Sequence, residues 1–214
     1  MTIRCRAVLL DMDGTLVDST KAVVAQWARW AERHGIPLAE VLAISHGVPA
    51  LDTMRKLAPQ AATQEELDRF MQEEESHEGG AVAVQGALAF VKQLPPERWA
   101  VVTSAPRSLA LMRVVAAGFP APRVLISPED VERGKPHPEP YLAAAERLRV
   151  VPAECFVVED APAGIASAHA AGMQVAAITT TYPRGRFNGD LAIASFEDLS
   201  LTFEDDEMVI RVTS

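Results

Sequence analysis

The amino-acid sequence predicts an α/β protein: a Rossmann-like, doubly wound parallel sheet core with an inserted all-helical cap. From residue 99 onward, short apolar runs rich in β-branched residues alternate with helical stretches, which is typical of repeated βα units. Before them, the block from residue 16 to about residue 85 shows helical periodicity. A chain of 214 residues is long enough for one sizeable domain with an insertion.

Six apolar runs are expected to form the strands of the sheet. The first one ends in an acid and is assigned to the same sheet as the others, which makes the helical block an insertion after the first strand. The strands are expected over 7–11, 99–104, 123–127, 155–160, 174–179 and 191–195, and helices over 106–117, 138–148 and 162–171. The tail "LTFEDDEMVIRV" (201–212) resembles a hairpin around an acidic turn.

The inserted block is expected to be a helical cap. Between residues 19 and 35, apolar residues recur at spacings of three and four, and Gly35 and Pro37 end the helix. Two more helices are expected over 49–57 and 63–77. We assign residues 1–15 and 87–214 to the core and residues 16–86 to the cap. Trp27 and Trp30 are interpreted as cap core rather than as a platform for a sugar.

Composition narrows the class of partner. The net charge is -9 and the pI is near 5.1, so the protein is negatively charged at neutral pH. Nucleic acid and anionic membranes repel such a protein, and we expect neither as a partner. Cys5 and Cys155 lie in apolar contexts without CxxC spacing, as expected for reduced core thiols in a cytoplasmic protein. We find no signal peptide or membrane span, and we expect a monomer that binds a small molecule.

Polar residues at the ends of the predicted strands form a set with recognisable chemistry. The first strand ends in Asp11, the second in Thr103 and Ser104, and the fourth in Glu159 and Asp160. Ligands of open parallel sheets bind at the carboxyl ends of the strands, so these side chains are expected to meet. Lys135, in the loop before the helix that leads to the fourth strand, adds a cation. The set can hold a divalent cation and a phosphoryl group together.

Each residue type suits a part of phosphoryl transfer. Carboxylates from two strand ends are the hard oxygen ligands that Mg2+ prefers. One carboxylate can also attack phosphorus and form an acyl phosphate, while a second moves protons. The Thr103 hydroxyl, the Lys135 ammonium and the amides at helix N-termini would hold phosphoryl oxygens. A simple turn at Asp11-Met12-Asp13-Gly14, or a solvated Lys135, are the alternatives for these residues taken singly.

Four motifs in order resemble those of the haloacid dehalogenase-like (HAD) phosphohydrolases with a helical cap inserted after the first motif. The motifs are "DMDGTLVDS" (11–19), "VVTSAPR" (101–107), "GKPHPEPY" (134–141) and "VVEDAPAGIASAHAAG" (157–172). The resemblance is strongest to sugar and polyol phosphatases, such as those for 2-deoxyglucose 6-phosphate, glycerol phosphate or hexitol phosphates. It implies a Mg2+-dependent phosphomonoester hydrolase that forms an aspartyl-phosphate intermediate.

The resemblance also implies a role for each matching position. Asp11 would be the nucleophile and Asp13 the acid/base. Thr103, Ser104 and Lys135 would bind the phosphoryl group, with Gly14 beside them. The implied ligands of Mg2+ are Asp11, the backbone carbonyl of Asp13, Asp160 and, in a direct or water-mediated way, Glu159. In the cap, His46 and Gly47 would contact the substrate; Val48 and Pro49 follow them where many relatives carry an arginine.

Other functions share parts of this pattern. A beta-phosphoglucomutase-like sugar phosphomutase has the same core motifs and differs in the acceptor of the phosphoryl group. A phosphonate hydrolase would need a cap lysine, for which the insertion offers Lys21 and Lys56. A dehalogenase would not require Asp13 or the metal ligands. A non-catalytic sugar-phosphate sensor would not need the intact set of acids, hydroxyl and lysine.

Overall fold

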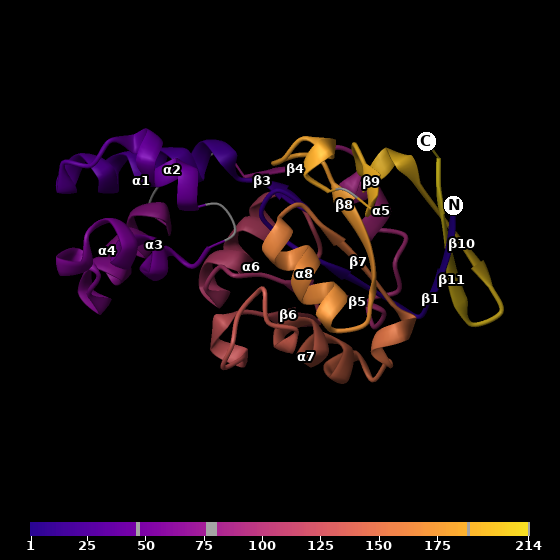
Figure 1. Cartoon of the computed structure of the whole chain (residues 1–214). Coiled ribbons are helices and arrows are strands. Elements are labelled where there is room, and N and C mark those ends of the chain that lie inside the picture. Colours follow the sequence, from indigo (N-terminus) through magenta and orange to yellow (C-terminus); the bar gives the residue numbers. More distant parts are fainter. Residues whose placement is uncertain (46–47, 76–80, 188, 214) are drawn as a thin grey trace.

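A computed structural model of the protein describes residues 1–45, 48–75, 81–187 and 189–213. Its centre is a sheet of six parallel strands in the order β6-β5-β2-β7-β8-β9 (Figure 1). In chain order these are β2 (Ala7–Leu10), β5 (Trp99–Val102), β6 (Val124–Ile126), β7 (Cys155–Glu159), β8 (Gln174–Ile178) and β9 (Leu191–Ile193). All six strands expected from the sequence are confirmed.

Helices cover both faces of the sheet, as predicted for a doubly wound fold. Successive side chains of a strand point to opposite faces. Val8 and Leu10 belong to the apolar cluster that includes residues of α5 (Ala87–Val91) and α6 (Arg107–Ala116). Ala7 and Leu9 belong to the cluster that includes residues of α7 (Glu139–Leu148) and α8 (Pro162–Ala170). The core is therefore two apolar layers separated by the sheet.

A second, antiparallel sheet closes the end of the molecule where both chain termini lie (Figure 1). Its strands are β1 (Thr2–Cys5), β11 (Glu207–Val212) and β10 (Leu199–Glu204), in that order. The hairpin of β10 and β11 confirms the expectation for the acidic tail. Met208 and Ile210 of β11 are buried in the same apolar cluster as α5 and α6, so the hairpin covers part of that layer.

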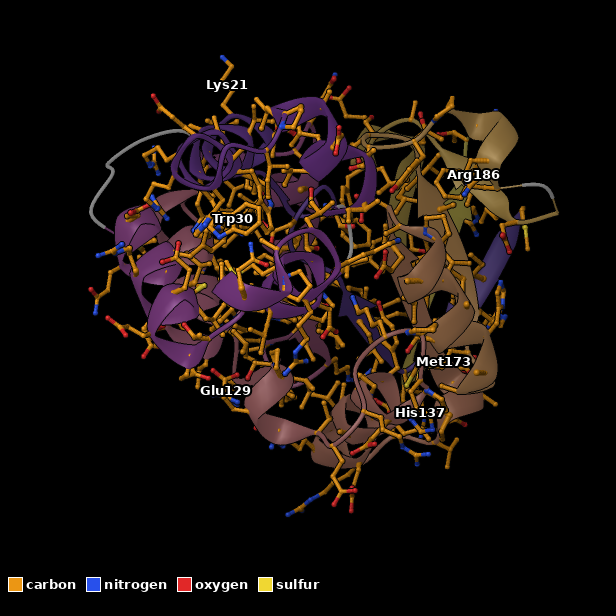
Figure 2. The ribbon with its side chains drawn as sticks, turned by 60° about the vertical axis from the view of Figure 1, so that its left-hand side comes forward. Lys21, Trp30, Glu129, His137, Met173 and Arg186 are labelled. Carbon is orange, nitrogen blue, oxygen red and sulfur yellow. The ribbon has the colours of Figure 1, made fainter. Side chains whose placement is uncertain are left out.

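The cap consists of α1 (Thr20–His34), α2 (Leu38–Ser45), α3 (Ala50–Leu57) and α4 (Gln64–Glu75), at the end of the molecule opposite the chain termini (Figure 1). It has an apolar cluster of its own, which includes Trp27, Trp30 and Phe70. Trp30 lies among the cap helices, whereas Lys21 points away from them (Figure 2). The interpretation of both tryptophans as cap core is consistent with this packing.

Two features near the cap were not expected from the sequence. The helix α2 fills the segment between the first two predicted cap helices. A two-residue antiparallel ribbon, β3 (Val17–Asp18) with β4 (Val82–Ala83), joins the segments that enter and leave the cap. The ribbon holds the two connections side by side, next to Asp13 and the end of β2. The cap therefore lies beside the carboxyl ends of the strands.

Short 3-10 turns complete the loops, at Pro59–Ala61, Pro128–Asp130, Pro152–Glu154, Arg184–Arg186 and Phe196–Asp198. Within the described ranges, each helix is too short or too polar to cross a lipid bilayer.

Candidate active site

The polar residues predicted at the strand ends meet at one edge of the sheet. Strand β2 lies between β5 and β7, so Asp11 after β2 has Thr103 after β5 on one side and Glu159 at the end of β7 on the other. The backbone amide of Asp11 donates to the Val158 carbonyl at 3.1 Å, which extends the hydrogen-bond ladder of the sheet to Asp11. The backbone thus fixes where this carboxylate points.

Lys135 joins two of these acids. Its ammonium donates to Asp11 Oδ1 at 2.7 Å, to Glu159 Oε1 at 2.6 Å and to the Val102 carbonyl at 2.9 Å. An ammonium group has three protons, and these three acceptors match them. The side chain is only 4% exposed. Lys135 is therefore a fixed internal cation and not the solvated charge that the loop sequence alone would suggest.

The charges of the site are strongly perturbed. Burial raises the pKa of Asp11 from its ordinary 3.8 to about 7, against the opposing effect of Lys135, and the charge of Glu159 adds to the rise. Burial, together with the Asp11 and Glu159 charges, raises the pKa of Asp160 well above its ordinary value. Burial acts to lower the pKa of Lys135, but the charges of Asp11 and Glu159 outweigh it and raise that pKa. One ammonium group does not balance three carboxyl groups here.

Asp11, Glu159 and Asp160 can converge on one cation. Each offers a carboxylate oxygen within 4.8 Å of the others, and all three are buried. Glu159 already uses both oxygens: Oε1 accepts from Lys135 and from the Tyr141 hydroxyl at 3.2 Å, and Oε2 accepts from the Ala161 amide at 2.8 Å. These bonds hold Lys135 and the loop after β7 in place, so Asp11 and Asp160 are better placed than Glu159 to bind a metal directly.

Two glycines make room for these acids. Gly14 has a φ of +82°, a left-handed conformation that favours glycine, and a Cβ there would overlap with Asp160 Oδ2. Its carbonyl accepts from the Thr180 hydroxyl. At Gly164, near the start of α8, a Cβ would overlap with the Glu159 carboxylate. The structure therefore places Gly14 on the site wall, where it permits the close approach of a carboxylate.

Asp13 is held apart from the buried acids. Its Oδ1 accepts from Ser19 Oγ at 2.6 Å and from Arg113 Nη1 at 2.6 Å. Ser19 is the N-cap residue of α1, but its hydroxyl donates to Asp13 and makes no capping hydrogen bond to the helix. The Asp13 side chain is 32% exposed, far more than that of Asp11. Its carboxylate therefore faces the cavity from the side where the chain enters the cap.

Thr103 and Ser104 line the cavity where the chain turns from β5 into α6. Thr103 is buried, and its Oγ1 accepts from the Ala105 amide at 3.0 Å. The Thr103 hydroxyl thus stabilises the turn and stays at the site, but it does not cap α6, whose N-cap is Pro106 and has no side-chain hydrogen bond. The first amide of α6, that of Arg107, donates to Glu129 Oε1 at 3.0 Å and not to the cavity, so the amide donor expected at the start of this helix is not found there.

One cavity of about 290 Å³ extends from the acids to the cap. Its cap wall combines apolar side chains, Val23, Trp27 and Phe70, with the polar Gln26 and Ser45. The Ser45 hydroxyl is buried and has no hydrogen-bond partner in the described part of the chain. The predicted contacts His46 and Gly47 lie outside the described residues, directly after Ser45. Such a wall can receive a molecule that carries both hydroxyl groups and carbon faces.

The sequence interpretation missed several residues of the site. Arg113 is the clearest: it lies on the buried side of α6 with Leu109, Ala110 and Val114. An arginine on the apolar stripe of a helix was a signal that could have marked it. Two other missed residues carry no such signal, because both fit ordinary helix faces. They are Gln26 and Tyr141, which contacts Lys135 and Glu159. Fold and site together define an enzyme with a carboxylate-centred active site beneath a helical cap.

Comparisons with known proteins agree with this class. The pattern of the haloacid dehalogenase-like hydrolases matches residues 5–172. The chain is 41% identical to hexitol phosphatase A of Escherichia coli, over 97% of this chain and 99% of that protein. It is 37% identical to glycerol-1-phosphate phosphohydrolase 2 of Saccharomyces cerevisiae, over 85% and 78% of the two chains. A HAD hydrolase of family IA, variant 3, from Entamoeba histolytica has the same fold, with a TM-score of 0.77 at 24% identity over 91% and 95% of the two chains.

The chain therefore belongs to the haloacid dehalogenase-like hydrolases, and within that family it is a phosphatase, a phosphoric monoester hydrolase. The family resemblance found in the four sequence motifs is confirmed, and so is the fold that it implied.

Gly164→Ala should destabilise the protein, although glycine-to-alanine changes inside helices ordinarily stabilise by about 1 kcal/mol. The new Cβ must displace Glu159, whose carboxylate is held by Lys135, Tyr141 and the Ala161 amide. We expect a loss of about 1–3 kcal/mol in the free energy of unfolding, measured by denaturant titration. Gly185→Ala, where a Cβ meets nothing within 4 Å, is the control. A gain in stability at Gly164 would contradict the packing described here.

Asp11→Asn should change how stability depends on pH in the presence of a chelator. The raised pKa means that the folded wild type keeps a proton that the unfolded chain releases near 3.8. Its free energy of unfolding should therefore fall, relative to the variant, as pH rises from about 4 to about 7, by on the order of 2–4 kcal/mol. Above pH 7, added Mg2+ should raise the free energy of unfolding of the wild type, and it should raise that of the variant less. Parallel pH profiles for the two proteins would refute this.

Proposed function

We propose that the protein is a Mg2+-dependent phosphomonoester hydrolase that releases phosphate from small sugar or polyol phosphates through an aspartyl phosphate on Asp11. The observation that carries this proposal is the placement of Asp11: its carboxylate is buried, bound to Lys135, and adjacent to Glu159 and Asp160 at the floor of the cavity. A nucleophile, a cation and metal ligands thus share one edge of the sheet.

The donor set fits a magnesium ion. Its members are buried carboxylates whose charges exceed that of Lys135, and the raised pKa values of Asp11 and Asp160 are the physical sign of that excess. Asp11 and Asp160 would hold the ion through carboxylate oxygens, Asp13 through its backbone carbonyl, and Glu159 directly or through water. When bound, Mg2+ would neutralise charge on the acids and on the phosphoryl oxygens.

Asp11 begins the reaction. One of its carboxylate oxygens attacks phosphorus while the bond from phosphorus to the ester oxygen breaks, which leaves the phosphoryl group on Asp11. Lys135 neutralises charge next to this oxygen, and the hydroxyls of Thr103 and Ser104 orient the phosphoryl oxygens.

Asp13 moves the protons. In the first step its carboxyl group gives a proton to the departing ester oxygen, which leaves as an alcohol. In the second step its carboxylate takes a proton from the water that attacks phosphorus; the bond from phosphorus to Asp11 breaks, and orthophosphate leaves. Asp13 is then protonated again and Asp11 is free, so the cycle closes.

The cap wall supports a small polyhydroxylated substrate. Gln26 and Ser45 offer polar groups, and Trp27 and Phe70 offer apolar faces. Relatives at 41% and 37% identity are a hexitol phosphatase and a glycerol-1-phosphate phosphohydrolase. Lys21 and Lys56 are exposed and do not line the cavity in the described part of the chain, so the Schiff-base chemistry of a phosphonate hydrolase has no support here.

With Mg2+, the wild type should release free phosphate from members of a panel of hexitol, glycerol, hexose and pentose phosphates, ranked by kcat/KM. Asp11→Asn should lower that release at least ~1,000-fold because the nucleophile is gone. Removal of Mg2+ with a chelator should abolish it as well. Asp206→Asn, which removes a carboxylate from the exposed hairpin, is the matched control and should keep full activity.

Two outcomes would overturn the proposal. Turnover by Asp11→Asn within a factor of two of the wild type would exclude the covalent mechanism. Interconversion of sugar phosphates that depends on a bisphosphate activator, without release of phosphate, would identify a beta-phosphoglucomutase-like phosphomutase instead.

A further inference from the structure

Arg113 is a buried cation that the roles assigned above do not include. It belongs to α6, the helix that follows Thr103 and Ser104, and this helix contacts α4 of the cap. Its side chain is only 6% exposed, and its Nη1 donates to Asp13 Oδ1 at 2.6 Å. Arg113 also lines the cavity. The guanidinium thus reaches the site from a different element than Lys135 and contacts a different acid.

Stability alone does not explain an arginine at this position. Its neighbours on the buried side of α6 are Leu109, Ala110 and Val114, and an apolar side chain of similar size would pack there. Replacement of a buried ion pair by apolar residues is often neutral or stabilising, because two charges no longer need to leave water. The guanidinium bonds the Asp13 carboxylate at 2.6 Å, so its charge can act on that acid.

Two donors fix the same oxygen of Asp13. Ser19 and Arg113 both bond to Oδ1, and they come from different elements: Ser19 from the entrance to the cap, Arg113 from a helix of the core. An oxygen held by two donors at 2.6 Å has little freedom to rotate. In the described part of the chain no donor bonds to Oδ2, which leaves that oxygen for a bound substrate.

We propose that Arg113 is a positioning residue of the reaction: it holds Asp13 so that Oδ2 meets first the departing ester oxygen and then the attacking water. This inference rests on the proposed function, since it concerns the two proton transfers assigned to Asp13. Arg113 itself exchanges no proton and forms no bond to phosphorus. General acid–base catalysis depends on such orientation and contributes about 100- to 10,000-fold to the rate.

The two transfers can be separated by the choice of leaving group. An alkyl phosphate, such as glycerol phosphate, needs the proton of Asp13 for the first step. 4-Nitrophenyl phosphate does not, because nitrophenolate leaves without a proton. For both esters, hydrolysis of the aspartyl phosphate still needs Asp13 as the base. A loss of positioning should therefore affect kcat/KM for the alkyl ester and leave kcat/KM for the aryl ester nearly unchanged.

The experiment compares the wild type with Arg113→Met in the presence of Mg2+. We expect kcat/KM for glycerol phosphate, or for the best alkyl ester of the panel, to fall by about 100-fold, and kcat/KM for 4-nitrophenyl phosphate by less than about threefold. With the aryl ester, kcat and KM should fall together, and rapid mixing should show a burst of about one nitrophenolate per enzyme before slow turnover.

Matched variants keep the result interpretable. Arg113→Lys should recover about tenfold of the lost alkyl activity, because an ammonium supplies a charge and a donor without the planar geometry of guanidinium. Arg107→Met, on the same helix but paired with Asp130 away from the cavity, should leave both esters within about twofold of the wild type. If Arg113→Met does not fold, Arg113→Lys is judged on the same two esters.

Equal losses of kcat/KM for both esters, or no loss for either, would overturn the role of Arg113. A failure of the proposed function looks different: the wild type itself would then release no phosphate from alkyl esters, whatever residue stands at position 113.

Discussion

Three carboxyl groups and one ammonium group share a buried site at the ends of neighbouring strands, and much of the structure serves to hold them there. Carboxylates repel one another strongly at low dielectric, so Asp11, Glu159 and Asp160 need a compensating charge. Lys135 supplies part of it through its bonds to Asp11 and Glu159. A divalent cation could balance the remaining negative charge.

The surrounding elements follow from this constraint. Tyr141 of α7 lies beneath the pair of Glu159 and Lys135, with the ammonium 5.2 Å from the centre of its ring. Gly14 and Gly164 leave the space that the carboxylates occupy. Asp13, two residues from Asp11, is kept outside the buried cluster by Ser19 and Arg113. Two nearby aspartates therefore have different surroundings, which is the condition for one to attack while the other moves protons.

Much of this could be predicted from the sequence because the relevant signals are local. Each strand of the parallel sheet is a short apolar run, and Asp11, Thr103 and Glu159 stand where such runs end. The helix α2 (Leu38–Ser45) was missed because it is apolar on most sides and shows little periodicity; β1 was missed because its partner, β11, is at the other end of the chain. The contact of Arg113 with Asp13 joins residues 100 positions apart, and only the packing of α6 against the sheet reveals it.

In the proposed mechanism, the phosphoryl group passes through Asp11 rather than directly to water. The stereochemical course at phosphorus tests this without requiring an intermediate to accumulate. A good substrate, made chiral at phosphorus with oxygen isotopes and one sulfur atom, is hydrolysed in labelled water with Mg2+, and the configuration of the released thiophosphate is determined. Two in-line displacements, at Asp11 and then at water, predict net retention of configuration. Net inversion would show a single displacement by water and exclude an aspartyl phosphate on Asp11.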